Sequence, residues 1–143
     1  MRPNLALAAL LVALAAPRAS AQFFGVTWDG DAVRIDPTTG AATVIGPTGH
    51  VQLNSMAKLL NGKLVTANVP SSEVPHLDYV DPVLGKATVF ACTFLNGIWA
   101  MAVDPNSGVL YALDSNGGGA IDNLYTLDLS VSFCDSAIKH LIG

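Results

Sequence analysis

The sequence repeats itself with a shift of 45 residues, and this repeat limits the fold more than any other feature. The segment DPTTGAATVIG at 36–46 aligns with DPVLGKATVFA at 81–91, and Met56-Ala57 aligns with Met101-Ala102 at the same shift. A third copy begins with VLYALD at 109–114 and reaches LYTLDL at 124–129. Because a fixed period of this length marks an array of one structural unit, we expect a repeat protein.

Each copy has the pattern of short strands joined by turns. The apolar stretches are five or six residues long, rich in Val, Ile, Leu and Tyr, and bounded by Gly, Pro, Asn and Asp. In Asp-Pro-x-x-Gly the Asp bonds to the backbone ahead of it, Pro fixes the first turn residue, and Gly accepts a positive φ. We therefore interpret Asp36, Asp81 and Asp104 as turn formers, and Asn61-Gly62 as a corresponding turn.

Two segments leave alternatives open. Residues 51–61 carry apolar residues at helical spacing, but the repeat pairs part of this window with WAMAV at 99–103, which favours a strand. The tail from 130 onward breaks the repeat. Either Leu141-Ile142-Gly143 mimics Val44-Ile45-Gly46 after a short insertion, or residues 135–141 form a small helix capped by Asp135.

The period and the composition of the strands together predict the architecture. The stretches WAMAV, VLYAL and ATVFA carry no charge, which indicates strands buried on both faces. Four such strands in about 45 residues are typical of a β-propeller blade. We predict an all-β fold, a partial β-propeller of about two and a half four-stranded blades, with units at 23–62, 63–108 and 109–143.

So few blades do not close a ring, because propellers have about four to eight of them. Three arrangements follow from this shortfall. Several chains share one ring as a homo-oligomer, the chain belongs to a longer propeller, or the stack stays open with exposed edge strands.

The residues also resemble a known group of proteins. The run GIWAMAVDPNSGVLYALDS at 97–115, followed by NLYTLD at 123–128, resembles the repeats of bacterial secreted propellers of the YVTN, NHL and quinoprotein-like group. The resemblance extends over nearly all of residues 23–129. It implies a propeller architecture and leaves the activity open, because such repeats recur in proteins with unrelated roles.

The first 21 residues have the features of a secretory signal peptide. Arg2 precedes an apolar run at 5–16, and Ala19-Ser20-Ala21 is a small-x-small cleavage site. A membrane span needs about 20 apolar residues, and Pro17-Arg18 interrupts this run too early. We predict that residues 22–143 are secreted or periplasmic, with no membrane attachment once the signal is removed.

Charge and cysteine content narrow the partners and the redox state. The chain has 7 Lys and Arg against 11 Asp and Glu, which argues against binding to nucleic acid. An exported chain meets an oxidising environment, so a disulfide between Cys92 and Cys134 is favoured over two free thiols.

A search for catalytic groups predicts no enzyme site. The sequence has no Gly-x-Ser-x-Gly elbow, no phosphate-binding glycine loop and a single Glu. His50, His76 and His140 lie far apart along the chain, and we interpret them as turn or surface residues rather than as zinc ligands. We therefore expect no catalytic residue and no cofactor.

Two loops that do not repeat are the candidate binding segments, because function on a repeat scaffold is concentrated in such loops. One is ANVPSSEVPHLD at 67–78, which contains Glu73 and His76. The other is DSNGGGAIDN at 114–123, whose Asp114, Asn116 and Asp122 are oxygen donors suited to calcium. This loop lacks the terminal Glu of an EF-hand, so a solvated hairpin loop is the favoured interpretation.

The two tryptophans occupy different places in the repeat. Trp28 lies at a strand end before a turn and joins Glu73 and His76 as a candidate binding residue. Trp99 follows Ile98 at the start of an apolar strand and is predicted to lie in the core.

Two functions fit the sequence. The favoured one is an exported, non-catalytic propeller-type scaffold or binding module that contacts a protein or glycan through its inter-strand loops. The alternative is a fragment of a propeller enzyme, lactonase-like or quinoprotein-like, whose ligands for a metal or cofactor come from other blades. Because the sequence contains no recognisable catalytic motif, the first function is favoured.

Overall fold

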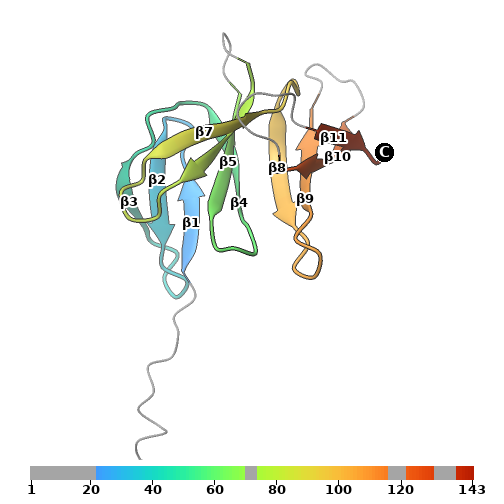
Figure 1. Ribbon diagram of the computed structural model, residues 1–143. Coiled ribbons are helices and arrows are strands. Elements are labelled where there is room, and N and C mark those ends of the chain that lie inside the picture. The colour runs from blue at the N-terminus through green and yellow to red at the C-terminus, as the bar shows by residue number, and fades with distance from the viewer. Residues whose placement is uncertain (1–21, 70–73, 116–121, 131–137) are drawn as a thin grey trace, which may run out of the picture.

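The computed structural model describes residues 22–69, 74–115, 122–130 and 138–143, and this part of the chain is all-β (Figure 1). Three antiparallel sheets follow one another along the chain, with strand orders β1-β2-β3, β4-β5-β6-β7 and β8-β9-β10-β11. The strands are β1 (Phe23–Val26), β2 (Asp31–Ile35), β3 (Ala42–Pro47), β4 (Leu53–Lys58), β5 (Leu64–Asn68), β6 (His76–Val80), β7 (Ala87–Cys92), β8 (Ile98–Val103), β9 (Leu110–Asp114), β10 (Asn123–Asp128) and β11 (Ile138–Leu141). The expected all-β class is confirmed.

The sheets are structural copies of one another. The pairing of β2 with β3 shifts register between Ala32 and Val33, and that of β6 with β7 shifts between Leu77 and Asp78, which are the same positions of the repeat. The β4–β5 and β8–β9 pairs likewise share one irregularity, 45 residues apart. Since a β-bulge is a specific local feature, its recurrence shows that the sequence repeat is a repeat of strand pairing.

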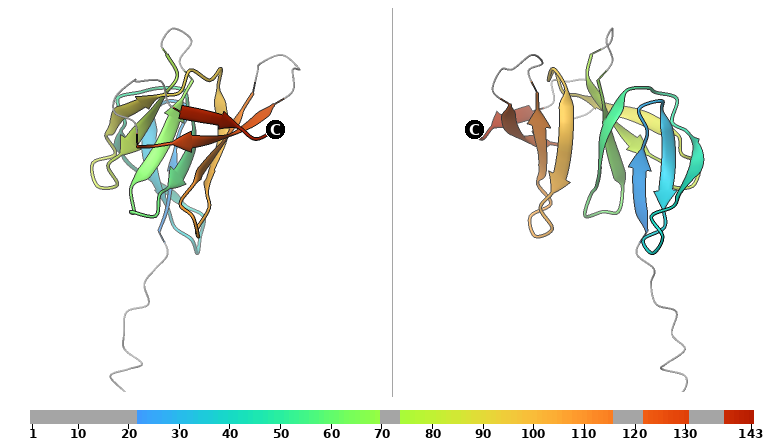
Figure 2. Two further views of the ribbon diagram at one scale, coloured as in Figure 1. Left: turned by 45° about the vertical axis from the view of Figure 1, so that its right-hand side comes forward. Right: turned by 180° about the vertical axis from the view of Figure 1, so that it is seen from behind.

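The borders of the sheets differ from the borders of the sequence units. Strand β4 lies within the first unit, 23–62, yet it pairs with β5 and opens the second sheet, and β8 opens the third sheet in the same way. No described strand occupies the corresponding position beside β1, so the first sheet has three strands. Strand β4 lies between β1 and β8 and links the three sheets into one body (Figures 1 and 2).

The Asp-Pro-x-x-Gly turns form as predicted. In each of them the Asp carboxylate accepts the N–H of the residue two positions ahead, at 2.7 Å for Asp36, 2.7 Å for Asp81 and 2.9 Å for Asp104. The closing Gly of each turn has a φ between +72° and +76°. Because successive strands are antiparallel, these turns lie at one end of the sheets, which we call the turn end; the opposite end is the linker end (Figure 1).

Two apolar clusters hold the sheets together. The larger lies between the second and third sheets and contains Leu77 and Ile98 among its fully buried side chains. The smaller lies between the first and second sheets and contains Ala32 and Val80. Every residue of β5 in the middle sheet is buried, so this strand is covered on both faces. The predicted burial of WAMAV on both faces is wrong, because Trp99, Ala100 and Ala102 on β8 are exposed.

The structure decides both open segments in favour of strands. Residues 53–58 form β4 rather than a helix. The chain end forms β11, and Leu124 continues the ladder by donating its N–H to Gly143 at 2.7 Å and accepting that of Ile142 at 2.8 Å. The end of the chain thus takes the place that Val44-Ile45-Gly46 takes in the first sheet. Asp135 lies outside the described residues.

The prediction that Trp99 lies in the core is wrong. Its side chain is 55% exposed. Trp99 stands between Ile98 and Ala100, where the pairing of β8 with β9 shifts register. An extra residue at a bulge does not follow the inward and outward alternation of its strand, so the apolar neighbours do not determine its direction.

Candidate functional site

Three of the predicted residues cannot be placed. Glu73, Asn116 and Cys134 lie outside the described residues. Cys92 is buried at the end of β7, and its predicted bridge to Cys134 stays a prediction.

The two aspartates of the second candidate loop, Asp114 and Asp122, lie in different environments. Asp114 is buried, and its Oδ1 accepts the N–H of Gly97 at 2.8 Å. This bond fixes the linker between β7 and β8, so Asp114 has a structural function of its own. Asp122 is exposed. Calcium binding by this loop stays a prediction.

The interpretation of His76 as a surface loop residue is wrong. His76 is the first residue of β6 and is 5% exposed, and its backbone N–H donates to Asn68 Oδ1 at 2.9 Å. Trp28, in contrast, is 51% exposed at the β1–β2 turn, where its carbonyl accepts the N–H of Gln52 at 2.7 Å. Trp28 is therefore a surface residue on a fixed backbone.

The structure brings His50 next to His76 and Asp78, which lie together in the segment 67–78. The rings of His50 and His76 meet edge to face with centroids 5.1 Å apart, and His76 Nε2 lies 3.3 Å from Asp78 Oδ1. One ligand atom from each of the three residues lies within 4.8 Å of the other two. The expectation that the histidines are isolated turn or surface residues is thus wrong for two of the three. We call these three side chains the His-His-Asp cluster.

The sequence contained a signal for two of the three residues of this cluster. His76 and Asp78 are two residues apart on one strand, and residues at this spacing point to the same face. That face of β6 also carries Val80, which packs toward the first sheet. His50 had no such signal, because it lies between β3 and β4 and its position depends on how two sheets meet.

The 48–52 linker holds His50 in place at the linker end. Thr48 Oγ1 donates to the carbonyl of Gly30 at 2.6 Å, and the carbonyl of Thr48 accepts the N–H of Ala87 at 2.9 Å. Gln52 connects in the same way to Trp28 in the first sheet and to Val69 in the second. The linker that carries His50 is therefore hydrogen-bonded to both of the first two sheets.

Asp78 differs from the other buried polar residues, although the partly buried Asn54 and Ser55 also have a side-chain atom that makes no hydrogen bond with a described residue. Thr48, Thr66, Asn68, Thr93 and Asp114 each make a side-chain hydrogen bond within the described part of the chain. Asp78 is 0% exposed, yet neither carboxylate oxygen accepts a hydrogen bond from a described residue. Burying a carboxylate without hydrogen bonds costs several kcal/mol, so this group calls for a compensating positive charge.

The outward faces of the first and third sheets are apolar and carry exposed or half-buried side chains, although Val33 on the first sheet is only 9% exposed. On the third sheet, Tyr111 and Leu113 alternate with the buried Leu110 and Ala112 and so point away from the core; Leu113 pairs with Leu124, which is exposed. On the first sheet, Phe23 pairs with Ile35, and Val33 pairs with Val44, on the face opposite Ala32. Phe23 and Val44 are also exposed. We call these two surfaces the end faces.

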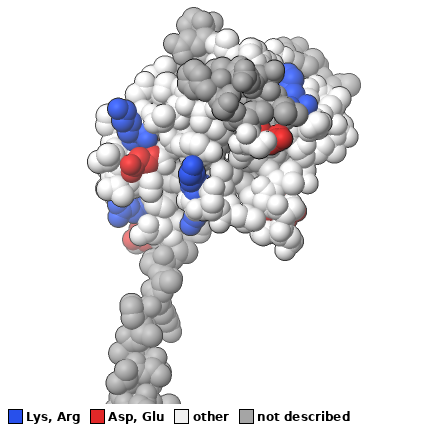
Figure 3. All heavy atoms as spheres, viewed as in Figure 1, with Lys and Arg blue, Asp and Glu red and all other residues white. Residues whose placement is uncertain are grey.

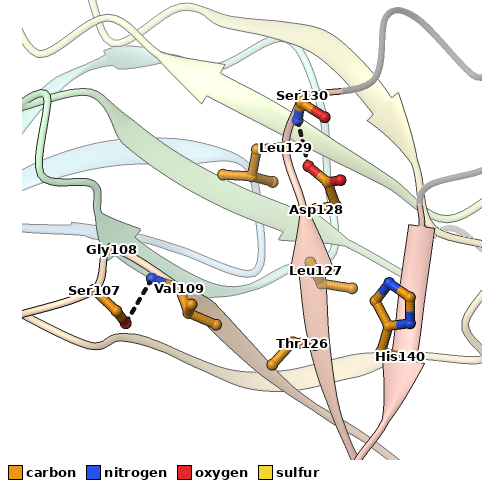
Figure 4. A pocket seen from close by; sticks show the side chains of 9 residues that line it. All are labelled: Ser107, Gly108, Val109, Thr126, Leu127, Asp128, Leu129, Ser130 and His140. Atoms are coloured by element: carbon orange, nitrogen blue, oxygen red, sulfur yellow. Dashed lines mark hydrogen bonds between the residues drawn. The ribbon is translucent and has the colours of Figure 1, made fainter.

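A shallow pocket recurs at the turn end of each sheet, with volumes of about 370, 450 and 440 Å³. Figure 4 shows the pocket of the third sheet, which lies between the β8–β9 turn and His140 on β11. The lining residues differ between copies: Arg34, Tyr79 and Thr126 line the three pockets from corresponding positions of the repeat. The three pockets therefore share a shape and do not share a binding chemistry.

Charged side chains are sparse on this surface. On the face shown in Figure 3, Lys and Arg are scattered singly and gather in no patch. Among the described residues, the structure has no helix that is long and apolar enough to cross a membrane.

Comparison with protein-family models, with curated proteins and with solved structures found no match. The resemblance to secreted bacterial propellers therefore stays a prediction based on the residues quoted for it.

Proposed function

We propose that this chain is an exported, non-catalytic scaffold of the propeller type that assembles head to tail with further copies of itself. The observation that carries the proposal is the pair of apolar end faces on sheets that are copies of one another. An apolar sheet face that carries exposed side chains such as Phe23, Val44 and Leu124 is typical of an interaction site.

The repeat identifies the occupant of the end faces. The outward face of the third sheet corresponds, strand for strand, to the face of the second sheet that packs on the third. The outward face of the first sheet corresponds in turn to the face of the second sheet that packs on the first. A third sheet stacked on the first sheet of another copy would therefore repeat a type of contact that the chain already makes within itself.

Such a contact joins two different surfaces, so it is heterologous, and it closes into a ring when the rotation between copies allows. Closure would complete the propeller that the repeat predicts. In this arrangement the inter-strand loops of all copies lie together at the linker end, where they would contact a protein or glycan.

The test is the mass of the purified protein in solution, measured by light scattering over a range of concentrations. We expect a discrete oligomer, and we expect Leu124→Asp or Phe23→Asp to convert it to monomers, because a charge on an end face is costly to bury. Val83→Asp is the matched control, since Val83 is more exposed than either but lies in a turn between β6 and β7. A folded monomer at every concentration would overturn the proposal.

A further inference from the structure

We propose that His50, His76 and Asp78 form a binding site for a divalent transition-metal ion of the zinc class, between the first and second sheets at the linker end. The proposal is independent of assembly into a ring. It starts from the geometry of the His-His-Asp cluster.

The buried Asp78 carboxylate is the first argument. Its oxygens accept no hydrogen bond from the described residues, and His76 Nε2 lies 3.3 Å from Oδ1. A bound divalent ion supplies the positive charge that a buried carboxylate needs, and it does so without hydrogen-bond donors. Thr66 and Asn68, on the neighbouring strand β5, make hydrogen bonds with other groups and donate none to the Asp78 carboxylate.

The orientation of His76 is the second argument. Its Nδ1 lies 3.1 Å from the carbonyl oxygen of Val74. A carbonyl accepts a hydrogen bond, so Nδ1 carries a proton; in the neutral ring the lone pair is then on Nε2, the nitrogen that lies beside Asp78. Metal-binding histidines in proteins are held by the same kind of contact on their second nitrogen.

The distances fit a common ion. Two ligands about 2.0 to 2.2 Å from a tetrahedral zinc ion lie roughly 3.4 Å apart. His76 Nε2 and Asp78 Oδ1 are 3.3 Å apart, which matches this separation. All three ligand atoms lie within 4.8 Å of one another, so binding requires the His50 ring to approach slightly. Gly49 precedes it with a φ of +87° and open space around it, which leaves room for this movement.

The donor set selects the class of metal. Two imidazoles and one carboxylate are typical ligands of zinc and its first-row neighbours, whereas calcium takes six to eight oxygens. His50 is only partly buried, so an ion reaches the cluster from solvent past this ring. The three protein ligands leave a fourth position for water, as in open zinc sites.

The experiment is a titration of the chelator-treated, purified protein with Zn²⁺ by calorimetry, followed by metal analysis after dialysis. We expect one equivalent of zinc per chain and a higher unfolding temperature with Zn²⁺ than with Ca²⁺. Replacing Zn²⁺ by Co²⁺ should produce the visible absorption bands of low-coordinate cobalt with nitrogen ligands.

Two variants and one control locate the site. His50→Ala removes a partly exposed ligand from the linker, and Asp78→Asn keeps the shape of the buried side chain while removing its charge. Each should weaken zinc binding at least about 100-fold, since loss of a group that only orients a ligand already costs 10- to 100-fold. His140→Ala, at an exposed histidine on β11, should leave the affinity unchanged.

Three results would overturn the proposal. The first is no stoichiometric zinc binding by the folded protein. The second is zinc binding that His140→Ala abolishes and His50→Ala leaves intact. The third is an Asp78→Asn variant that is more stable than the wild type while zinc changes the stability of neither, because the cluster would then be a proton-sharing pair only.

Discussion

The replacement of Gly30 by alanine tests how the first two sheets are joined. Gly30 lies in the β1–β2 turn with a φ of +98°, and a Cβ at this position would stand 2.0 Å from the carbonyl oxygen of His50. The obstacle is backbone rather than a flexible side chain, so the 48–52 linker must move by more than an ångström. The carbonyl of Gly30 accepts two bonds from Thr48, at 2.8 Å from its N–H and 2.6 Å from its Oγ1.

The expected cost has two parts. A positive φ costs an alanine about 1 to 2 kcal/mol. Moving the linker also weakens the two bonds from Thr48 and the bond from Gln52 to Trp28, each with a net value of about 1 kcal/mol. Gly30→Ala should therefore lower the free energy of unfolding by about 3 to 5 kcal/mol.

The matched control is Gly49→Ala in the same linker. Gly49 has a φ of +87°, and a Cβ there meets nothing within 4 Å, so only the cost of about 1 to 2 kcal/mol applies. Urea unfolding followed by circular dichroism, at one protein concentration, measures both values. Equal destabilisation by the two substitutions would refute the argument that the Gly30–His50 contact joins the sheets.

Three further outcomes are expected. Leu77→Ala, at a fully buried site between the second and third sheets, should cost about 2 to 5 kcal/mol in urea unfolding, and a cost below 1 would show a loosely packed core. Acid should destabilise the protein, because hydrogen bonds lower the pKa of four aspartates below their ordinary value of 3.8. The stabilisation from these carboxylates is present above pH 3.8 and is lost as the pH falls through the lowered pKa values. A urea midpoint of unfolding that stays constant from pH 5 to about pH 2 would contradict this prediction. If the predicted Cys92–Cys134 bridge forms, reductant should lower the free energy of unfolding by about 2 to 4 kcal/mol and have no effect on Cys134→Ser.

The lowered pKa values of these aspartates have a local cause that their spacing in the sequence already implies. The backbone N–H of Thr38 lowers the pKa of Asp36, and that of Leu84 lowers the pKa of Asp81. The Ser107 hydroxyl does the same for Asp104, and the Ser130 backbone for Asp128. These carboxylates stabilise turns and are poor candidates for proton transfer near neutral pH.

The pockets at the turn end recur in all three sheets, but the side chains that line them differ. Each sheet builds the same hollow because its turns recur. In the second sheet, Lys63 lies 4.3 Å from the ring centre of Tyr79, which in turn stacks on Phe90. Neither the first nor the third sheet has an aromatic residue in place of Tyr79. A series of equivalent binding sites, as in a repeat lectin, is therefore not built into this end.

The sequence by itself determined the parts of this protein that depend on neighbours along the chain. The Asp-Pro-x-x-Gly turns, the short apolar stretches and the 45-residue period all follow from local preferences, and together they specified the all-β class. Only the tertiary structure decided which strands share a sheet, because β4 is close in sequence to β3 but pairs with β5. It also decided that Trp99 is exposed and that His50 meets His76 and Asp78. Such features depend on where a bulge reverses alternation and on which faces meet, and both are set by packing between strands that are distant along the chain.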